Sequence, residues 1–365
     1  MLSLNLRTPS PSTRSGSVSA DPLPVPCYRL RIVQAVLTER YGDNDRVQLR
    51  EIDPPRIGPK DLLVRVRAAS INPLDSKIRD GKVKTLLHYS FPLLLGNDLS
   101  GEIVDIGSDV TRFAKGEAIY ARLDKERIGA FAELAAVSER AAARKPSNLS
   151  HVEAASLPLV GLTSWQALLE LGRLERGQKV LIHGGSGGVG TFALQLARHV
   201  GATVYTTASA RNHELVTRLG ADVAIDYRQQ RFEDVAKDCD LVFDTQGGET
   251  LLRSFSCVRP GGVVVSVGGV PDAKFARAWG LNPLLVLALG MMTRKVTSAA
   301  KKQGARFEYL FMRADGAQLA QITALVEQDV IKPVLDRTYP LAQAKDALAY
   351  SESGRATGKV VLEVQ

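Results

Sequence analysis

The sequence predicts an α/β protein in two parts, a β-rich domain followed by a doubly wound parallel sheet. Short apolar runs separated by Gly, Pro and Asp fill residues 33–137. From Lys179 onward, short apolar runs alternate instead with stretches of helical spacing, and a glycine-rich turn joins the first such run to the first such stretch. The chain has 365 residues, which is enough for two domains with separate cores.

The first 30 residues bear on where the protein resides. They are rich in Ser and Pro, so we expect a disordered tail over residues 1–30. Their Arg and Ser content resembles an organellar transit peptide, and a start codon placed too far upstream is the alternative. The three cysteines lack paired spacing, which indicates a reducing compartment. We therefore expect a cytoplasmic protein, or a mitochondrial or plastid one if the tail is a genuine transit peptide.

The β-rich domain is expected over residues 31–156. Its candidate strands are Val33–Leu37, Val47–Ile52, Leu62–Ala69, Gly101–Ile106, Ala118–Ala121 and Ala130–Val137. Near the end of the chain, Lys359–Val364 is another strand-like run, so we expect residues 305–365 to return and complete this domain. The nucleotide-binding domain is then expected over residues 157–304.

The segment Lys179–Val200, KVLIHGGSGGVGTFALQLARHV, is built as a strand, a turn and a helix. The glycines of its turn satisfy the pattern GxGxxG: Gly185, Gly187 and Gly190. The first glycine permits a tight turn, the second lets backbone N–H groups approach phosphates, and the third allows close packing of helix on strand. Because the helix also directs its N-terminus at the turn, the segment predicts a dinucleotide pyrophosphate site.

Later residues favour one dinucleotide over the other. Further expected strands are Thr203–Thr207, Val223–Ile225, Leu241–Phe243 and Gly262–Val267. An NAD site needs an acid near the end of the second strand, yet no acid occurs between Gly190 and His213. Ser209 and Arg211 stand there instead and can bind a 2′-phosphate, although Arg211 also fits an ordinary solvated residue that opens a helix. The sequence therefore favours NADPH.

Charge and hydropathy exclude two other classes of partner. The net charge is +8, but no basic block or aromatic-basic interleaving marks a nucleic-acid surface. The most apolar run, Leu281–Met292, is too short to span a bilayer. We expect it to form a buried helix or an apolar cover over a substrate cleft.

Five motifs in order resemble the zinc-free quinone oxidoreductase branch of the medium-chain dehydrogenase/reductase superfamily. They are AASINPLD at Ala68–Asp75, GNDLSGEIVDIG at Gly96–Gly107, LPLVGLTSW at Leu157–Trp165, HGGSGGVG at His183–Gly190, and the closing TGKVVLEV. Further motifs are similar to the reticulon-interacting mitochondrial quinone reductases and to bacterial NADP-dependent oxidoreductases. The resemblance implies a GroES-like catalytic domain joined to a Rossmann domain, with the active site between them.

The resemblance also implies that no metal is bound. Zinc-dependent members use Cys, His and acidic ligands. The matching positions hold Asn72, the pair Asn97–Asp98, and the apolar Leu159–Val160. Without a Lewis acid the reaction needs an electron sink in the substrate, so we expect hydride transfer to a quinone or an α,β-unsaturated carbonyl.

Candidate catalytic residues are Asn72, Asp75 and Lys77. Relatives commonly carry a tyrosine where this chain has Ser76-Lys77, so Lys77 is either a proton donor or a solvated loop lysine. Asn72 and Asp75 are expected to shape the cleft, although Asn-Pro is also a turn signal and Asp75 fits a helix cap.

The resemblance assigns the cofactor contacts residue by residue. Around the phosphates and adenosine they are Ser186, Gly187, Gly188, Val189, Ser209, Arg211 and Tyr227. Toward the nicotinamide they are Thr163, Thr245, Val267, Gly268, Gly269, Phe311, Arg355, Ala356 and Thr357, where the glycines also fit an ordinary loop. The expected partner is a small quinone or enone, and a homodimer is possible. An enoyl-thioester reductase and a non-catalytic NADPH-binding scaffold are the alternative functions.

Overall fold

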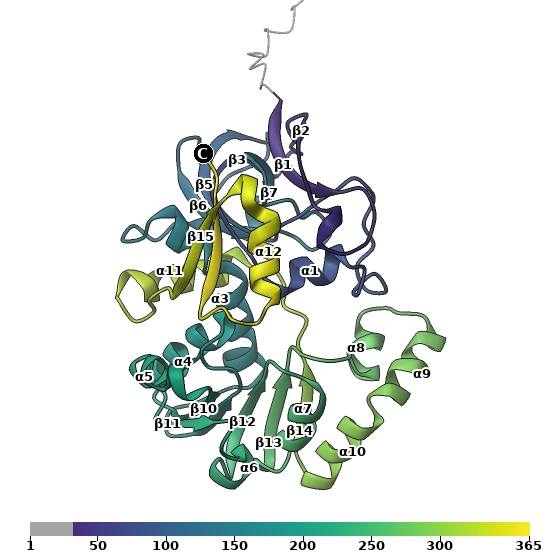
Figure 1. Cartoon of the computed structure of the whole chain (residues 1–365), viewed down its shortest axis with the longest axis vertical. Coiled ribbons are helices and arrows are strands. Elements are labelled where there is room, and N and C mark those ends of the chain that lie inside the picture. Colours follow the sequence, from purple (N-terminus) through teal and green to yellow (C-terminus); the bar gives the residue numbers. More distant parts are fainter. Residues whose placement is uncertain (1–31) are drawn as a thin grey trace, which may run out of the picture. The chain divides into compact units, whose positions relative to one another are not determined.

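Two sheets form the first lobe of the computed structural model, which describes residues 32–365 (Figure 1), and their strands pair antiparallel except for the parallel pair β15–β16. The smaller has the order β2-β1-β4 and the larger the order β15-β16-β3-β5-β6-β8, with β7 paired to β3. The strands are β1 (Val33–Thr38), β2 (Gln48–Ile52), β3 (Asp61–Ser70), β4 (Leu93–Leu94), β5 (Asp98–Ile106), β6 (Ala118–Arg122), β7 (Leu134–Ser138), β8 (Ala142–Arg144), β15 (Leu335–Pro340) and β16 (Lys359–Glu363). Because Val361 of β16 lies opposite Ser70 of β3, the last strand completes this lobe. The predicted tail, residues 1–30, lies outside the described residues.

A six-stranded parallel sheet forms the second lobe, in the order β11-β10-β9-β12-β13-β14. Its strands are β9 (Lys179–Ile182), β10 (Thr203–Ala208), β11 (Val223–Asp226), β12 (Cys239–Asp244), β13 (Val258–Ser266) and β14 (Arg306–Tyr309). The order reverses at β9, which is the doubly wound arrangement expected from the sequence. The expected boundary after residue 304 is one strand too early, because β14 pairs in parallel with β13. This edge strand alternates charged and aromatic residues and so lacks the apolar run that marks its neighbours.

Helices flank the sheets and join the lobes (Figure 1). They are α1 (Pro73–Arg79), α2 (His151–Ala155), α3 (Pro158–Trp165), α4 (Gly188–Val200), α5 (His213–Arg218), α6 (Phe232–Val235), α7 (Gly248–Ser254), α8 (Ala273–Ala278), α9 (Pro283–Met292), α10 (Arg294–Gln303), α11 (Gly316–Glu327) and α12 (Ala344–Glu352), with a π-helical turn at Gln166–Leu171 and 3-10 turns at Asn44–Arg46, Glu139–Ala141, Ala210–Asn212 and Leu341–Gln343. From residue 32 to residue 365, none of these helices has the length and apolar character to cross a membrane.

The apolar run Leu281–Met292 forms a helix, but it is not buried. Asn282 caps α9 by accepting a hydrogen bond from the N–H of Leu285, and only Leu289 of the helix is buried. The expectation of a buried helix is therefore wrong, because hydropathy reports the composition of a helix and not what packs against it.

Separate apolar cores fill the two lobes. Val180, Ile182 and Phe192 belong to the core between the parallel sheet and α4. Leu99, Ile119 and Leu362 belong to the core of the first lobe. Rigid cores on both sides fix the positions of the loops that meet between the lobes, and the candidate site lies there.

Candidate functional site

Two pockets meet at the glycine turn between β9 and α4. The first extends into the cleft between the lobes, and the second lies over the ends of β10 and β11. Five residues line both pockets: Gly184, Gly187, Gln246, Gly354 and Ala356. The pockets therefore form one continuous groove whose middle is the glycine turn, and this shape suits an elongated ligand with its narrow part at the turn.

The three motif glycines have different surroundings. A Cβ on Gly185 would lie 2.2 Å from Thr206 Oγ1, and one on Gly190 would lie 2.2 Å from the carbonyl oxygen of Gly184. These two positions need glycine for the packing of turn, strand and helix. A Cβ on Gly187 would meet only the Gly184 oxygen, at 3.4 Å, because this residue faces the groove.

The turn also presents unpaired donors to the groove. Gly187 is the N-cap of α4, and no side chain caps the helix. The first N–H groups of α4 therefore lack partners within the helix and carry partial positive charge. An anion such as a pyrophosphate fits this end of the helix.

The second pocket holds the residues expected around the adenosine. Strand β10 ends at Ala208, one residue beyond its predicted end, so Ser209 and Arg211 follow the strand directly. Both line the pocket together with Ser186 and Tyr227. Asn212, which sequence reasoning missed, donates a hydrogen bond from Nδ2 to Ser186 Oγ (2.9 Å) and holds that hydroxyl beside the turn.

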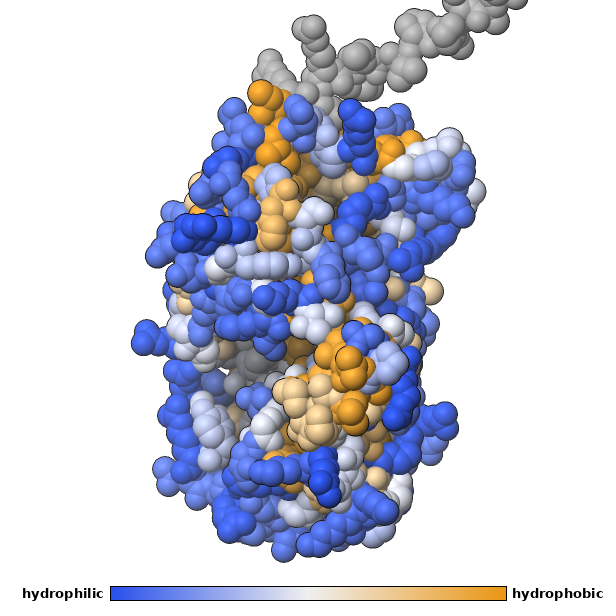
Figure 2. All heavy atoms as spheres, turned by 90° about the vertical axis from the view of Figure 1, so that its right-hand side faces the viewer, coloured by the Kyte–Doolittle hydropathy of each residue, from blue (hydrophilic) through white to orange (hydrophobic). Residues whose placement is uncertain are grey.

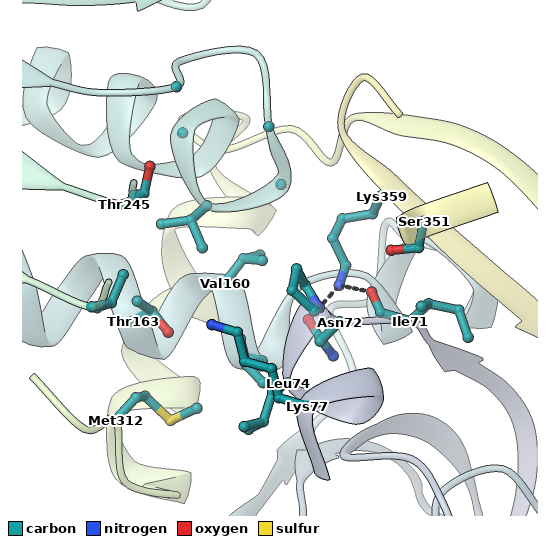
Figure 3. A pocket seen from close by; sticks show the side chains of 18 of the residues that line it. Ile71, Asn72, Leu74, Lys77, Val160, Thr163, Thr245, Met312, Ser351 and Lys359 are labelled. Carbon is teal, nitrogen blue, oxygen red and sulfur yellow. Dashed lines mark hydrogen bonds between the residues drawn. The ribbon is translucent and has the colours of Figure 1, made fainter. Parts of the chain in front are cut away.

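In the first pocket, Asn72 is held by a buried network. Its Nδ2 donates to Asp98 Oδ2 (2.9 Å), and its Oδ1 accepts from Lys359 Nζ (2.6 Å). Lys359 also donates to the carbonyl oxygen of Ile71 (2.7 Å), as Figure 3 shows. Burial lowers the pKa of Lys359, while the nearby Asp98 and Asp75 oppose that shift. The amide of Asn72 is therefore fixed in one orientation, with a buried charge on each side.

Asp75 lies behind Asn72 and does not line either pocket. Its Oδ2 accepts from the backbone N–H of Asn72 (2.7 Å) and its Oδ1 from Asn97 Nδ2 (2.6 Å). These bonds make it the N3 residue of a capping box at the start of α1. Burial raises the pKa of Asp75 to about 7. The helix-cap interpretation describes its position, so Asp75 supports Asn72 and does not face the cleft.

Lys77 is on the exposed side of α1 and lines the first pocket. Figure 3 shows its ammonium nitrogen directed into the pocket, on the side of Thr163. The surrounding wall is mostly apolar and includes Leu74, Val160 and Met312. This arrangement places a single flexible cation at the edge of an apolar cleft, where it can reach a polar atom of a bound ligand.

The other expected cofactor residues divide into two groups. Gly188, Val189, Thr245, Val267 and Phe311 line the first pocket with Thr163, and Ala356 lines both pockets. Gly268, Gly269, Arg355 and Thr357 line neither. Gly268 packs against Gly247, since a Cβ on it would lie 2.6 Å from the Gly247 nitrogen. Gly268 therefore has a packing role against Gly247, as the loop interpretation expects.

Sequence reasoning missed two buried cations of the first pocket. Lys359 comes from β16, and Arg122 from the end of β6. Arg122 is 1% exposed, and its Nε lacks a partner among the described residues. Each is a basic residue within an apolar strand segment, and this pattern could have marked both. Such a residue usually lies on the solvent face of its strand, so the pattern alone does not indicate burial.

The residues at the positions where zinc-dependent members carry their ligands do not suit zinc. Asn72 and Asn97 offer neutral amides, Leu159 offers no donor, and the Lys359 ammonium already occupies the side of Asn72 Oδ1. Asp98 is taken up as an acceptor from Asn72, Ser70 and the backbone N–H of Leu159. These side chains therefore do not form a zinc site.

Comparisons with known proteins agree along the chain. Residues 58–147 match the family model described as alcohol dehydrogenase GroES-like domain, and residues 219–362 match one described as zinc-binding dehydrogenase. The chain is 33% identical to the mouse protein named NAD(P)H oxidoreductase RTN4IP1, mitochondrial, over 92% of this chain and 90% of that protein. It is 33% identical to the Arabidopsis thaliana NADPH-dependent alkenal/one oxidoreductase, chloroplastic, over 88% and 77%. The quinone oxidoreductase structure from Coxiella burnetii matches with a TM-score of 0.80 and 31% identity, over 92% of this chain and all of that one.

Proposed function

The chain belongs to the medium-chain dehydrogenase/reductase superfamily, in its quinone oxidoreductase branch, and from this premise we propose that it is an NADPH-dependent reductase of quinones or α,β-unsaturated carbonyls. The continuous groove carries the proposal. Its second pocket offers Ser209 and Arg211 to a 2′-phosphate, its middle offers the glycine turn to a pyrophosphate, and its first pocket is an apolar cleft beside Lys77.

The cofactor supplies the hydride from its nicotinamide ring, and the protein supplies the surroundings. The apolar wall formed by Leu74, Val160 and Met312 keeps water away from the reacting atoms. Asn72 shapes one side of the cleft, because its Nδ2 donates to Asp98 and to the carbonyl oxygen of Ser70 while its Oδ1 accepts from Lys359.

Lys77 is proposed to donate a hydrogen bond, and then a proton, to the substrate oxygen on which negative charge develops. The observation behind this role is the direction of its ammonium group, which points into the pocket (Figure 3). In an apolar cleft, a charge-assisted hydrogen bond to that oxygen lowers the barrier more than it would in water.

NADPH oxidation measured with 1,4-benzoquinone, 9,10-phenanthrenequinone, an enone and crotonyl-CoA tests the function. We expect turnover with the quinones and the enone. Tight NADPH binding without turnover of any acceptor would refute the enzyme and favour a scaffold, and turnover of crotonyl-CoA alone would favour a thioester reductase.

A matched pair of variants tests the role of Lys77. Lys77→Met should lower kcat at least tenfold with little change in NADPH affinity, since general acid catalysis contributes about 100-fold or more. Lys84→Met, on an exposed lysine that lines neither pocket, is the control and should leave kcat unchanged. Equal rates for the two variants would remove Lys77 from the proposal.

We also propose a homodimer and a cytoplasmic location. The sheet ends at β14, whose outer edge pairs with no other described strand, and we propose that a second copy pairs there. Light scattering during size-exclusion chromatography measures the dimer.

The names of the relatives given above include the words mitochondrial and chloroplastic, so an organelle is the alternative to the proposed cytoplasmic location. Mass spectrometry of the native N-terminus, to see whether residues 1–30 are removed, decides between them.

A further inference from the structure

Helix α9 exposes large apolar side chains on the surface of the second lobe. Leu284 is 80% exposed, Leu287 61%, Met291 64% and Met292 66%. Leu284, Leu287 and Met291 are spaced three and four residues apart and so share one face of the helix. Figure 2 shows this side of the molecule, where an apolar area stands out against hydrophilic surroundings. Water is a poor solvent for such a helix, and an exposed face of this kind is typical of an interaction site.

The side chains of α8, α9 and α10 carry charge of one sign. Residues 273–303, which contain α8, α9 and α10, include six Lys or Arg residues and no Asp or Glu: Lys274, Arg277, Arg294, Lys295, Lys301 and Lys302. All six are exposed. Of these six basic residues, only Lys274 has an ion-pair partner among the residues that the structure describes, and that partner is Glu308. An apolar helix bordered by unpaired cations complements a surface that is negatively charged outside and apolar beneath.

We propose that α9 and α10 dock this protein on the anionic surface of a lipid bilayer. The Leu and Met side chains of α9 would enter the boundary between headgroups and acyl chains, while the basic residues of α10 would contact the headgroups. A second copy of the chain fits this face less well, since docking two copies here would bring their cations together with no acid in residues 273–303 to pair with them.

Aromatic side chains connect the docking surface to the wall of the first pocket. Phe275 of α8 and Trp279, which follows this helix, stack at 4.9 Å between ring centroids, and Trp279 meets Phe311 edge-on at 4.9 Å. Phe311 lines the first pocket. These aromatic rings join the base of α9 to the wall of the cleft. This inference rests on the proposed function, and it makes the substrate a lipid-soluble quinone that reaches the cleft from the membrane.

Vesicle sedimentation with the full chain tests the surface. We expect the protein to sediment with phosphatidylcholine vesicles that contain phosphatidylglycerol, and far less with phosphatidylcholine alone. Lys301→Gln combined with Lys302→Gln should lower the partition coefficient roughly 30-fold at low salt, at about fivefold for each charge. Leu284→Gln, Leu287→Gln and Met291→Gln together should lower it at least tenfold. Lys60→Gln with Lys237→Gln, two exposed lysines outside residues 273–303, is the matched control and should bind as the unmodified protein does.

Reduction of 1,4-benzoquinone in vesicle-free buffer separates this proposal from the proposed function. Variants that keep this activity but lose vesicle binding support the surface, and they should also lose the stimulation by vesicles of turnover with a long-chain quinone. Absence of vesicle binding by the unmodified protein, or equal binding by all variants, overturns the surface alone. A concentration-dependent dimer that the α9 variant abolishes also overturns it, in favour of a second copy. Vesicle binding without turnover of any quinone or enone overturns the proposed function and leaves the surface intact.

Discussion

Replacing Gly187 with Ala distinguishes a turn that binds a ligand from one that only packs. The residue has φ −80° and ψ 170°, which alanine adopts without strain. Its new Cβ would meet only the Gly184 oxygen, at 3.4 Å. The gain from restricting the unfolded chain, about 0.4–1 kcal/mol, offsets a loss of up to about 1 kcal/mol from putting Ala at an N-cap. We therefore expect the stability of the ligand-free protein to change by less than about 1 kcal/mol.

Binding of NADPH should respond differently. The added methyl group fills the space through which the pyrophosphate would approach the N–H groups of α4, and overfilling a close contact costs about 1–3 kcal/mol. The dissociation constant for NADPH should therefore rise roughly 5- to 150-fold, at about 1.4 kcal/mol for each factor of ten. NADPH fluorescence titration measures this constant, and thermal unfolding without ligand measures stability.

Gly190→Ala is the matched variant. Its Cβ would lie 2.2 Å from the Gly184 oxygen and 2.6 Å from the Gly185 Cα, so the backbone itself must move. We expect it to lower the melting temperature of the ligand-free protein, unlike Gly187→Ala. If Gly187→Ala bound NADPH with an unchanged dissociation constant, the pyrophosphate would not lie at this turn and the proposed course of the groove would be wrong.

Three further perturbations test other parts of the structure. Ser209→Asp with Arg211→Ala should weaken NADPH relative to NADH at least tenfold in kcat/KM, because a carboxylate repels the 2′-phosphate, and an unchanged ratio would misplace the 2′-phosphate site. Lys359→Met should destabilise the protein by about 3 kcal/mol in urea unfolding, because it removes the donor to Asn72 and leaves the buried Asp98 with Arg122 as its remaining nearby cation. A loss no larger than that of an exposed-lysine variant would contradict this. Burial lowers the pKa of His183 to about 3 from its usual 6.5. The contribution of the neutral imidazole to the free energy of unfolding is therefore fully present above pH 6.5 and is lost as pH falls toward 3, by up to about 1.4 kcal/mol per pH unit. His183→Gln should flatten this slope between pH 6.5 and 5, and equal slopes would exclude His183 as its origin.

Local features of the site could be predicted from the sequence, and features that depend on the topology of the fold could not. The glycine turn and the loop after β10 could be predicted because strand, turn and helix are adjacent in the chain. Lys359 could not, because its partner Asn72 is 287 residues away and only the pairing of β16 with β3 brings them together. The hydrogen bond that Asp75 accepts from Asn97 likewise joins residues from separate segments, 22 positions apart.

The exposure of α9 was the other property that local pattern could not supply. Its residues are apolar on every side, so periodicity distinguishes no buried face. The helix is exposed because no other described element covers it, and residues adjacent in the sequence do not indicate whether such an element is present.

The pairing of β16 sets the order in which the protein can assemble during synthesis. The parallel sheet of the second lobe is complete once residues 179–309 have emerged from the ribosome, since its strands all lie within that stretch. The larger sheet of the first lobe must wait for Lys359–Glu363, although its partner strand β3 is made almost 300 residues earlier. The edge of β3 at Ala68–Ser70 therefore stays open until β16 has been made. Chaperones that hold nascent chains should accordingly bind this edge before residue 359 is made, and release it once Lys359–Glu363 has been added.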